Sequence, residues 1–148
     1  KVKSFIAITE QEGGKLVQGG KIHSDLGSGW YIEPTIFDNV TADMTLFQQE
    51  VFGPILAVTT FTSDEEAVAL ANNSSYGLAA SLYTESLKRA QRVSRAIRAG
   101  TVSINGFSEG DITTPFGGFK QSGFGGRDKG LEALQQYVQT KTIWYVQD

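Results

Sequence analysis

Cysteine is absent from the 148 residues of this sequence. Disulfide bonds, thiolate–metal sites and thiol nucleophiles are therefore excluded within these residues. Histidine occurs once, as His23, in the polar stretch KIHSDLGSGW. A catalytic histidine needs a base partner and a nucleophile nearby, whereas a solvated loop histidine needs neither, so the sequence favours the loop interpretation. One histidine with scattered carboxylates has no recognisable ligand spacing, and we expect no metal site.

Long hydrophobic runs and a large charge excess of either sign are also missing. No run approaches the roughly eighteen apolar residues that span a bilayer, and no secretory signal peptide opens the chain. The net charge is −3 and 20% of the residues are charged, which is typical of a soluble globular protein. The basic residues between 88 and 98 are not interrupted by aromatic side chains that stack on bases, so we interpret them as a solvated helix face. We expect a cytoplasmic protein that binds neither membranes nor nucleic acid.

Strand and helix patterns alternate through the middle of the chain. After an opening helix with no capping residue at its start, the sequence predicts strands over residues 15–20, 29–40, 54–61, 78–83 and 101–105. Ser63 and Glu66 form a capping box for the first helix between these strands, and Thr84 is suited to cap the second. The run 54–61 has almost no polar alternation, so we expect it to be buried on both faces. This βαβαβ order predicts an α/β fold with a partial parallel sheet and flanking helices.

Glycine is concentrated between Gly106 and Gly130. The segment fits neither phosphate-binding template, because it lacks the Gly-Lys-Ser/Thr of a P-loop and has Asp128 where the third dinucleotide glycine belongs. A tightly folded loop that packs against other backbone is therefore favoured over a phosphate cradle. A short helix is expected over 131–138, and the β-branched and aromatic residues of 141–148 predict a final strand.

Glu50 and Phe52 stand where the chain enters the expected strand 54–61. Taken alone, they would be a solvated loop carboxylate and a core aromatic. Five stretches, however, resemble the aldehyde dehydrogenase superfamily in order and nearly in spacing. They are EVFGPILAV, ANNSSYGLAASLYT, AGTVSIN, PFGGFKQSGFG and KTIW. The resemblance covers essentially the whole chain and matches only the C-terminal part of such an enzyme.

The resemblance implies roles for four side chains and no catalytic or metal-binding residue. Glu50 takes the place of the glutamate that hydrogen-bonds the nicotinamide ribose, and Phe52 that of the phenylalanine beside the nicotinamide. Leu78 matches a residue that borders the same pocket, and Phe116 matches an aromatic that lines the aldehyde tunnel. Residues 122–127 carry one residue more than the family's usual Ser-Gly-x-Gly-Arg ending.

The resemblance also implies a function, with one alternative. It implies part of an NAD(P)-dependent enzyme that oxidises an aldehyde to a carboxylic acid. In such an enzyme the catalytic cysteine, the general-base glutamate and the domain that binds most of the NAD or NADP lie upstream of this region. Residues 1–140 would belong to the catalytic domain and 141–148 to an oligomerisation strand, which suggests a homo-oligomer. The sequence does not identify the aldehyde, although the stretch around Glu109 and Asp111 is similar to members acting on amino-aldehydes. The alternative is a non-catalytic assembly module derived from the family.

Overall fold

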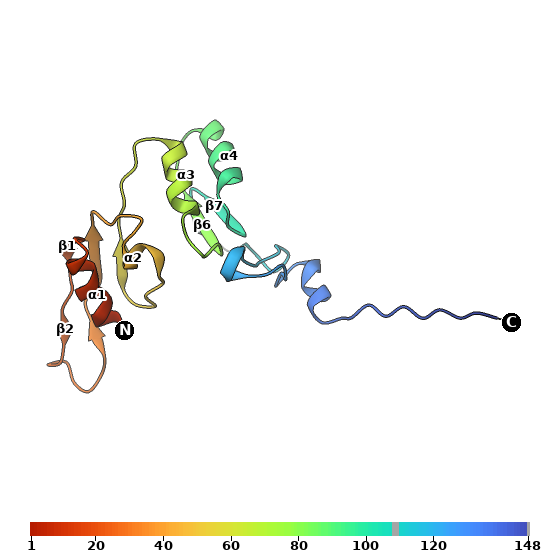
Figure 1. Cartoon of the computed structure of the whole chain (residues 1–148), viewed down its shortest axis with the longest axis horizontal. Coiled ribbons are helices and arrows are strands. Elements are labelled where there is room, and N and C mark those ends of the chain that lie inside the picture. The colour runs from red at the N-terminus through yellow and green to blue at the C-terminus, as the bar shows by residue number, and fades with distance from the viewer. Residues whose placement is uncertain (108–109, 148) are drawn as a thin grey trace. The chain divides into compact units, whose positions relative to one another are not determined.

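A computed structural model describes residues 1–107 and 110–147 of the chain. The chain divides into two compact units, Lys1–Ser74 and Ser75–Asp148, and each contains helices and parallel strands (Figure 1). This mixture confirms the predicted α/β class. Within the described ranges, no helix is long and apolar enough to cross a membrane.

The first unit is built on a three-stranded sheet. Its elements are α1 (Val2–Gln11), β1 (Lys15–Gln18), β2 (Ile22–His23), β3 (Tyr31–Ile32), β4 (Thr35–Asp38), α2 (Thr45–Gln48), β5 (Ile55–Ala57) and α3 (Asp64–Asn72). The sheet order is β1-β4-β5, with β1 antiparallel and β5 parallel to β4. Strands β2 and β3 form a separate antiparallel hairpin.

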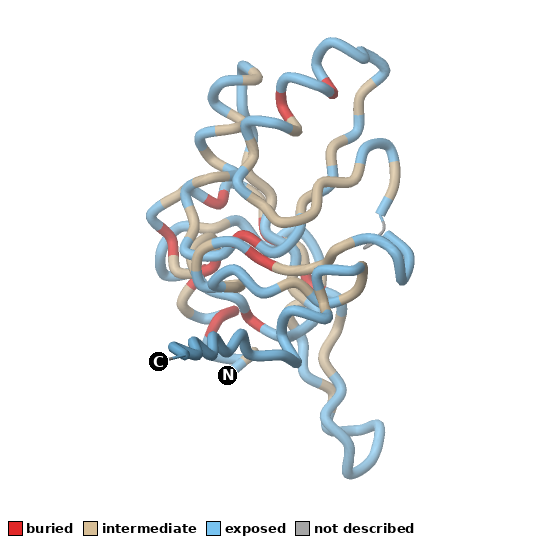
Figure 2. The backbone as a smooth tube through the Cα atoms, turned by 90° about the vertical axis from the view of Figure 1, so that its right-hand side faces the viewer, coloured by how far each residue is buried: buried red, intermediate tan, exposed pale blue. Residues whose placement is uncertain are grey.

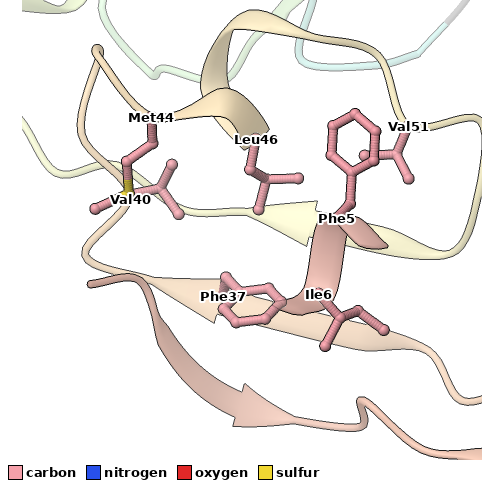
Figure 3. Packing of buried hydrophobic residues seen from close by; sticks show 7 residues of the cluster. All are labelled: Phe5, Ile6, Phe37, Val40, Met44, Leu46 and Val51. Atoms are coloured by element: carbon pink, nitrogen blue, oxygen red, sulfur yellow. The ribbon is translucent and has the colours of Figure 1, made fainter. Parts of the chain in front are cut away.

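One apolar core joins α1 and α2 to this sheet. Phe37 of β4 is fully buried at its centre, and Figure 3 shows the residues that surround it, which are Phe5, Ile6, Val40, Met44, Leu46 and Val51. Because α1 supplies Phe5 and the chain around α2 supplies Leu46 and Val51, burial of these side chains fixes the path of the chain that leaves α2.

The second unit contains a small βαβ element. Its elements are β6 (Ala79–Leu82), α4 (Leu87–Ala96), β7 (Thr101–Ile104) and the 3₁₀ helices η1 (Lys120–Ser122) and η2 (Leu131–Gln136). Strands β6 and β7 pair in parallel along their whole length, and α4 connects them and buries Ala90 and Val93. Its remaining residues are mostly exposed, so the basic positions lie on a solvated face, as the sequence predicts.

The helix caps confirm one prediction and correct another. Ser63 Oγ accepts a hydrogen bond from the Glu66 N–H at 3.1 Å, as expected of a capping box. The Glu66 carboxylate also accepts the Thr62 N–H at 2.8 Å. The prediction that Thr84 caps α4 is wrong. Ser86 is the cap, because its Oγ accepts from Arg89 N–H at 3.2 Å, while Thr84 Oγ1 accepts from Ser86 N–H.

Two predicted strands differ substantially from expectation. The strand expected over 29–40 is divided into β3 and β4 around Pro34, which has no N–H to donate to a sheet. The strand expected over 54–61 is reduced to β5, and Leu56 and Ala57 are exposed instead of buried. Leu56 and Ala57 of β5 remain uncovered in the part of the chain that the structure describes. An apolar run predicts the burial of a strand only where neighbouring elements cover both faces.

The C-terminal segment departs most from expectation. The helix expected over 131–138 is a 3₁₀ helix over Leu131–Gln136. Residues 141–147 form no strand and are all exposed (Figure 2), and the segment extends away from the preceding 3₁₀ helix (Figure 1). Asp148 lies outside the described residues. A strand exists only through hydrogen bonds to a neighbour, so high β-propensity does not produce one in this chain by itself. Pairing with another chain stays a prediction.

Candidate functional site

The segment after α2 turns Glu50 and Phe52 to solvent by burying the residue between them. Val51 is only 7% exposed and packs in the core, whereas Phe52 is 79% exposed. Glu50, on the other side of Val51, is exposed as well. The core role considered for Phe52 taken alone is therefore wrong. The segment presents one carboxylate and one aromatic ring two positions apart.

The backbone of Phe52 is in an unfavourable conformation. Its φ is +54°, in the left-handed region that costs an L-residue with a large side chain about 1–2 kcal/mol. Gly53 follows, and a Cβ at that position would lie 2.6 Å from Val2 Cγ2 of α1, so a side chain there would have to displace Val2. Pro54 then accepts a hydrogen bond from Thr35 N–H at 2.8 Å and starts the pairing of β5 with β4. Strain of this kind, imposed by the surrounding structure, is characteristic of functional sites.

Lys1 places a positive charge beside this segment. Its Nζ donates to the Glu50 carbonyl at 2.9 Å and lies 5.2 Å from the centre of the Phe52 ring and 5.8 Å from that of Phe5. These distances are within the range of cation–π attraction. The ammonium therefore stabilises both the backbone of Glu50 and the orientation of Phe52.

Leu78 and Phe116 lie in the second unit, on segments that meet at Gly100. Leu78 precedes β6, is 41% exposed, and accepts a hydrogen bond from Thr101 N–H through its carbonyl. Gly100 donates its N–H to Gly77, and a Cβ on Gly100 would overlap the Gly117 carbonyl. These close backbone contacts place Leu78, at the start of β6, next to the loop that carries Phe116.

Phe116 is held by its backbone in the glycine-rich loop. It exchanges two hydrogen bonds of 2.7 Å with Asp128, and Lys129 Nζ lies 5.1 Å from its ring. The ring borders a hollow of about 170 Å³, whose other lining residues are Gly117, Gly118, Ser122, Gly123, Phe124, Gly126, Asp128 and Gln136. A Cβ on Gly118 would overlap the Ser122 carbonyl. These close approaches confirm the loop as one that packs against its own backbone.

His23 belongs to the β2–β3 hairpin and faces two carboxylates. Its Nε2 lies 3.0 Å from Glu33 and its Nδ1 lies 3.3 Å from Asp25. The hydrogen bond to Glu33, together with that to Asp25, raises the pKa of His23, and the same bond to His23 lowers the pKa of Glu33. In the described part of the chain, no group of three or more histidine and carboxylate side chains could hold a metal ion. The arrangement fits a structural role for His23 in the hairpin.

The hairpin is expected to be most stable at mildly acidic pH. A raised His23 pKa contributes stability that is complete below its ordinary value of 6.5 and is lost as the pH rises through the folded-state value. A lowered Glu33 pKa contributes stability that is complete at pH values above its ordinary pKa of 4.5. This stability is lost as the pH falls through the folded-state value. Amide protection factors of the hairpin, corrected for intrinsic exchange, should fall from about pH 5.5 to about pH 8.5. His23→Gln should remove this dependence, and an equal fall in that variant would contradict the assignment.

Comparison with known proteins points to one family. The profile described as "Aldehyde dehydrogenase family" matches residues 1–143. The chain is 57% identical over 117 residues to the aminoacetaldehyde dehydrogenase of Pseudomonas aeruginosa, and this match covers 79% of the chain and 24% of the relative. It is 48% identical over 143 residues to the NADP/NAD-dependent aldehyde dehydrogenase PuuC of Escherichia coli. This match covers 97% of the chain and 28% of the relative.

The fold agrees with this similarity. A mutant of the P. syringae indole-3-acetaldehyde dehydrogenase AldA, solved with NAD⁺, matches with a TM-score of 0.91 at 49% identity. This match covers 97% of the chain and 29% of that protein. The chain therefore spans less than a third of the length of the relatives it matches.

Proposed function

This chain belongs to the aldehyde dehydrogenase family, and we propose that it is part of a longer enzyme that oxidises an aldehyde to a carboxylic acid with NAD or NADP. The observation that carries the proposal is the Glu50–Phe52 segment, in which Val51 is buried in the core while a carboxylate and an aromatic ring are exposed. The segment lies within the family match over residues 1–143. The matched relatives are dehydrogenases, which favours an enzyme over a non-catalytic assembly module.

The residues on this segment fit the nicotinamide end of such a cofactor. An exposed carboxylate accepts hydrogen bonds from two vicinal ribose hydroxyls, each charge-assisted bond contributing roughly 1.5–3 kcal/mol. We assign this role to Glu50. Phe52 offers an exposed apolar ring to the flat face of a nicotinamide and keeps water from it, which would account for its strained backbone. The bound cofactor would supply the hydride acceptor.

We assign the other two residues to the walls of the reaction site. Leu78 would contribute an apolar wall to the nicotinamide pocket, and Phe116 would shape the entrance of the aldehyde. The glycine-rich loop around Phe116 packs against its own backbone. We propose, as the resemblance implies, that most of the dinucleotide binds to a part of the enzyme outside these residues.

An amino-aldehyde is the substrate that we propose to test first. The support is the 57% identity to an aminoacetaldehyde dehydrogenase. Of the two acidic residues noted in the similar stretch, the structure describes only Asp111. Glu109 lies outside the described residues, and the Asp111 carboxylate accepts the Thr113 N–H at 2.8 Å, a turn-forming contact. Hydrogen bonds from Thr113 lower the pKa of Asp111, consistent with a charged residue that closes a turn.

We also propose that the enzyme is a homo-oligomer in which residues 141–148 pair with a neighbouring chain. The support is the exposure of Ile143, Trp144, Tyr145 and Val146. Apolar and aromatic residues rarely remain uncovered in such a continuous run.

The function is tested by assaying two polypeptides in parallel. The longer polypeptide that contains these residues should reduce NAD or NADP when aminoacetaldehyde or another aldehyde is added. The 148-residue chain should not, because it has no thiol to attack the aldehyde. Failure of the longer polypeptide with both dinucleotides and a panel of aldehydes would overturn the proposal. Reduction proportional to the amount of the 148-residue chain would overturn the reasoning from the missing thiol.

A further inference from the structure

We propose that Glu12 is a positioning residue for the Glu50–Phe52 segment, an inference that rests on the cofactor role proposed above. Glu12 is the residue that ends α1, and its carboxylate reaches the start of α2. It accepts Thr45 N–H at 2.8 Å and the Thr45 hydroxyl at 2.6 Å. This pairing joins residues 33 positions apart in the sequence.

The segment that carries Glu50 cannot maintain its conformation by itself. Helix α2 has four residues, far fewer than the roughly 12–15 that an isolated helix needs to be even marginally stable. Phe52 has a left-handed backbone, and its ring is too exposed for burial to offset the cost. The direction of the segment must therefore be imposed by its neighbours.

Burial in the core supplies only part of that constraint. Leu46 and Val51 pack near Phe5 and Ile6 of α1, as Figure 3 shows. Apolar contact is non-directional. It therefore fixes how deeply the segment lies in the core better than it fixes the rotation of the segment about its own axis. Hydrogen bonds are directional, so they restrict the rotation of the segment that burial of Val51 leaves open.

Helix α1 supplies directional contacts from both of its ends. At its start, the flexible Lys1 side chain makes one bond, to the Glu50 carbonyl. At its end, Glu12 makes two charge-assisted bonds to one residue, which define an orientation as well as a distance. Glu12 is itself fixed, since its N–H bonds the Ile8 carbonyl at 2.8 Å and Gly13 turns the chain away with φ +97°. Because α1 is a rigid helix, the position of Glu12 at its end determines where α2 begins.

The chemistry of the Glu12–Thr45 contact also suits a helix start. A carboxylate beside the first N–H groups of a helix is favoured by the partial positive charge there. Glutamine at position 12 could still accept the Thr45 N–H and donate to its hydroxyl, whereas alanine could do neither. The two replacements therefore separate loss of the contact from loss of the charge.

The experiment compares Glu12→Ala, Glu12→Gln and the control Glu10→Ala in the longer polypeptide. Glu10 is an exposed carboxylate of the same helix. Glu12→Ala should slow single-turnover hydride transfer about tenfold while the dinucleotide Kd changes less than about twofold, because misplacement affects reaction more than binding. Glu12→Gln should recover most of the rate, and Glu10→Ala should match the wild type. Without cofactor, hydrogen exchange of residues 45–52 should be faster in Glu12→Ala than in Glu10→Ala.

The outcomes separate this inference from the function on which it rests. If the wild-type polypeptide reduces neither dinucleotide, the proposed function fails and the inference fails with it. If the wild type is active and Glu12→Ala transfers hydride at the rate of Glu10→Ala, only the inference fails. Equal losses of rate, dinucleotide binding and melting temperature, with no recovery in Glu12→Gln, would mean that Glu12 is merely structural and would also overturn it.

Discussion

Replacing Glu50 by glutamine in the longer polypeptide should slow hydride transfer at least about tenfold, because one lost charge-assisted bond of roughly 1.5–3 kcal/mol corresponds to one or two factors of ten in rate. Dinucleotide binding should weaken much less, because loss of orientation at the reacting end affects the chemical step more than binding in the ground state. The melting temperature should not change, because the Glu50 side chain is exposed and only its carbonyl accepts the bond from Lys1.

Single-turnover kinetics with the dinucleotide Kd measured separately would test this expectation. Uniform loss of binding would raise KM and leave the rate of the chemical step unchanged, whereas loss of orientation lowers that rate. Glu10→Gln is a suitable control, because it removes the same charge from an exposed position on α1. An unchanged single-turnover rate in Glu50→Gln would mean that the carboxylate is only a solvated loop residue.

Local interactions in this protein could be predicted from the sequence. Ser63 caps α3 through a residue three positions away, and the parallel pairing of β6 with β7 follows from a short strand–helix–strand pattern. Both depend on hydrogen bonding and burial within one stretch of chain. Residue types at close spacing carry enough information to specify such features.

The features that depend on distant contacts could not be predicted in the same way. Nothing in the sequence near Glu12 indicates its bonds to Thr45, because the partner lies 33 residues away. The φ of +54° at Phe52 contradicts the conformational preference of phenylalanine, and it occurs between the buried Val51 and Gly53, whose backbone closely approaches α1. The resemblance to a family identified Glu50 and Phe52, while the structure supplied the physical reason why they face solvent together.

The expected C-terminal strand is absent for the same reason, since a strand also depends on partners distant in the sequence. This segment gives the second prediction with a large expected effect. Residues 141–147 have the β-propensity of a strand but pair with no other strand in the part of the chain that the structure describes. Trp144 and Tyr145 are 85% and 84% exposed. Successive strand residues point to opposite faces, so at least one of these rings should be covered if the segment pairs with another subunit.

Deleting Lys141–Asp148 from the longer polypeptide should therefore shift it toward smaller assemblies. A buried aromatic side chain removes about 150–250 Å² from water, worth at most about 4–6 kcal/mol at 25 cal/mol per Å². Association costs offset part of this, so we expect the subunit Kd to rise at least about tenfold. Removing only Gln147 and Asp148 retains both rings and should leave the assembly unchanged. Light scattering across a dilution series measures both variants. The same assembly size at every concentration after the longer deletion would mean that the interface lies elsewhere and that this segment has no part in it.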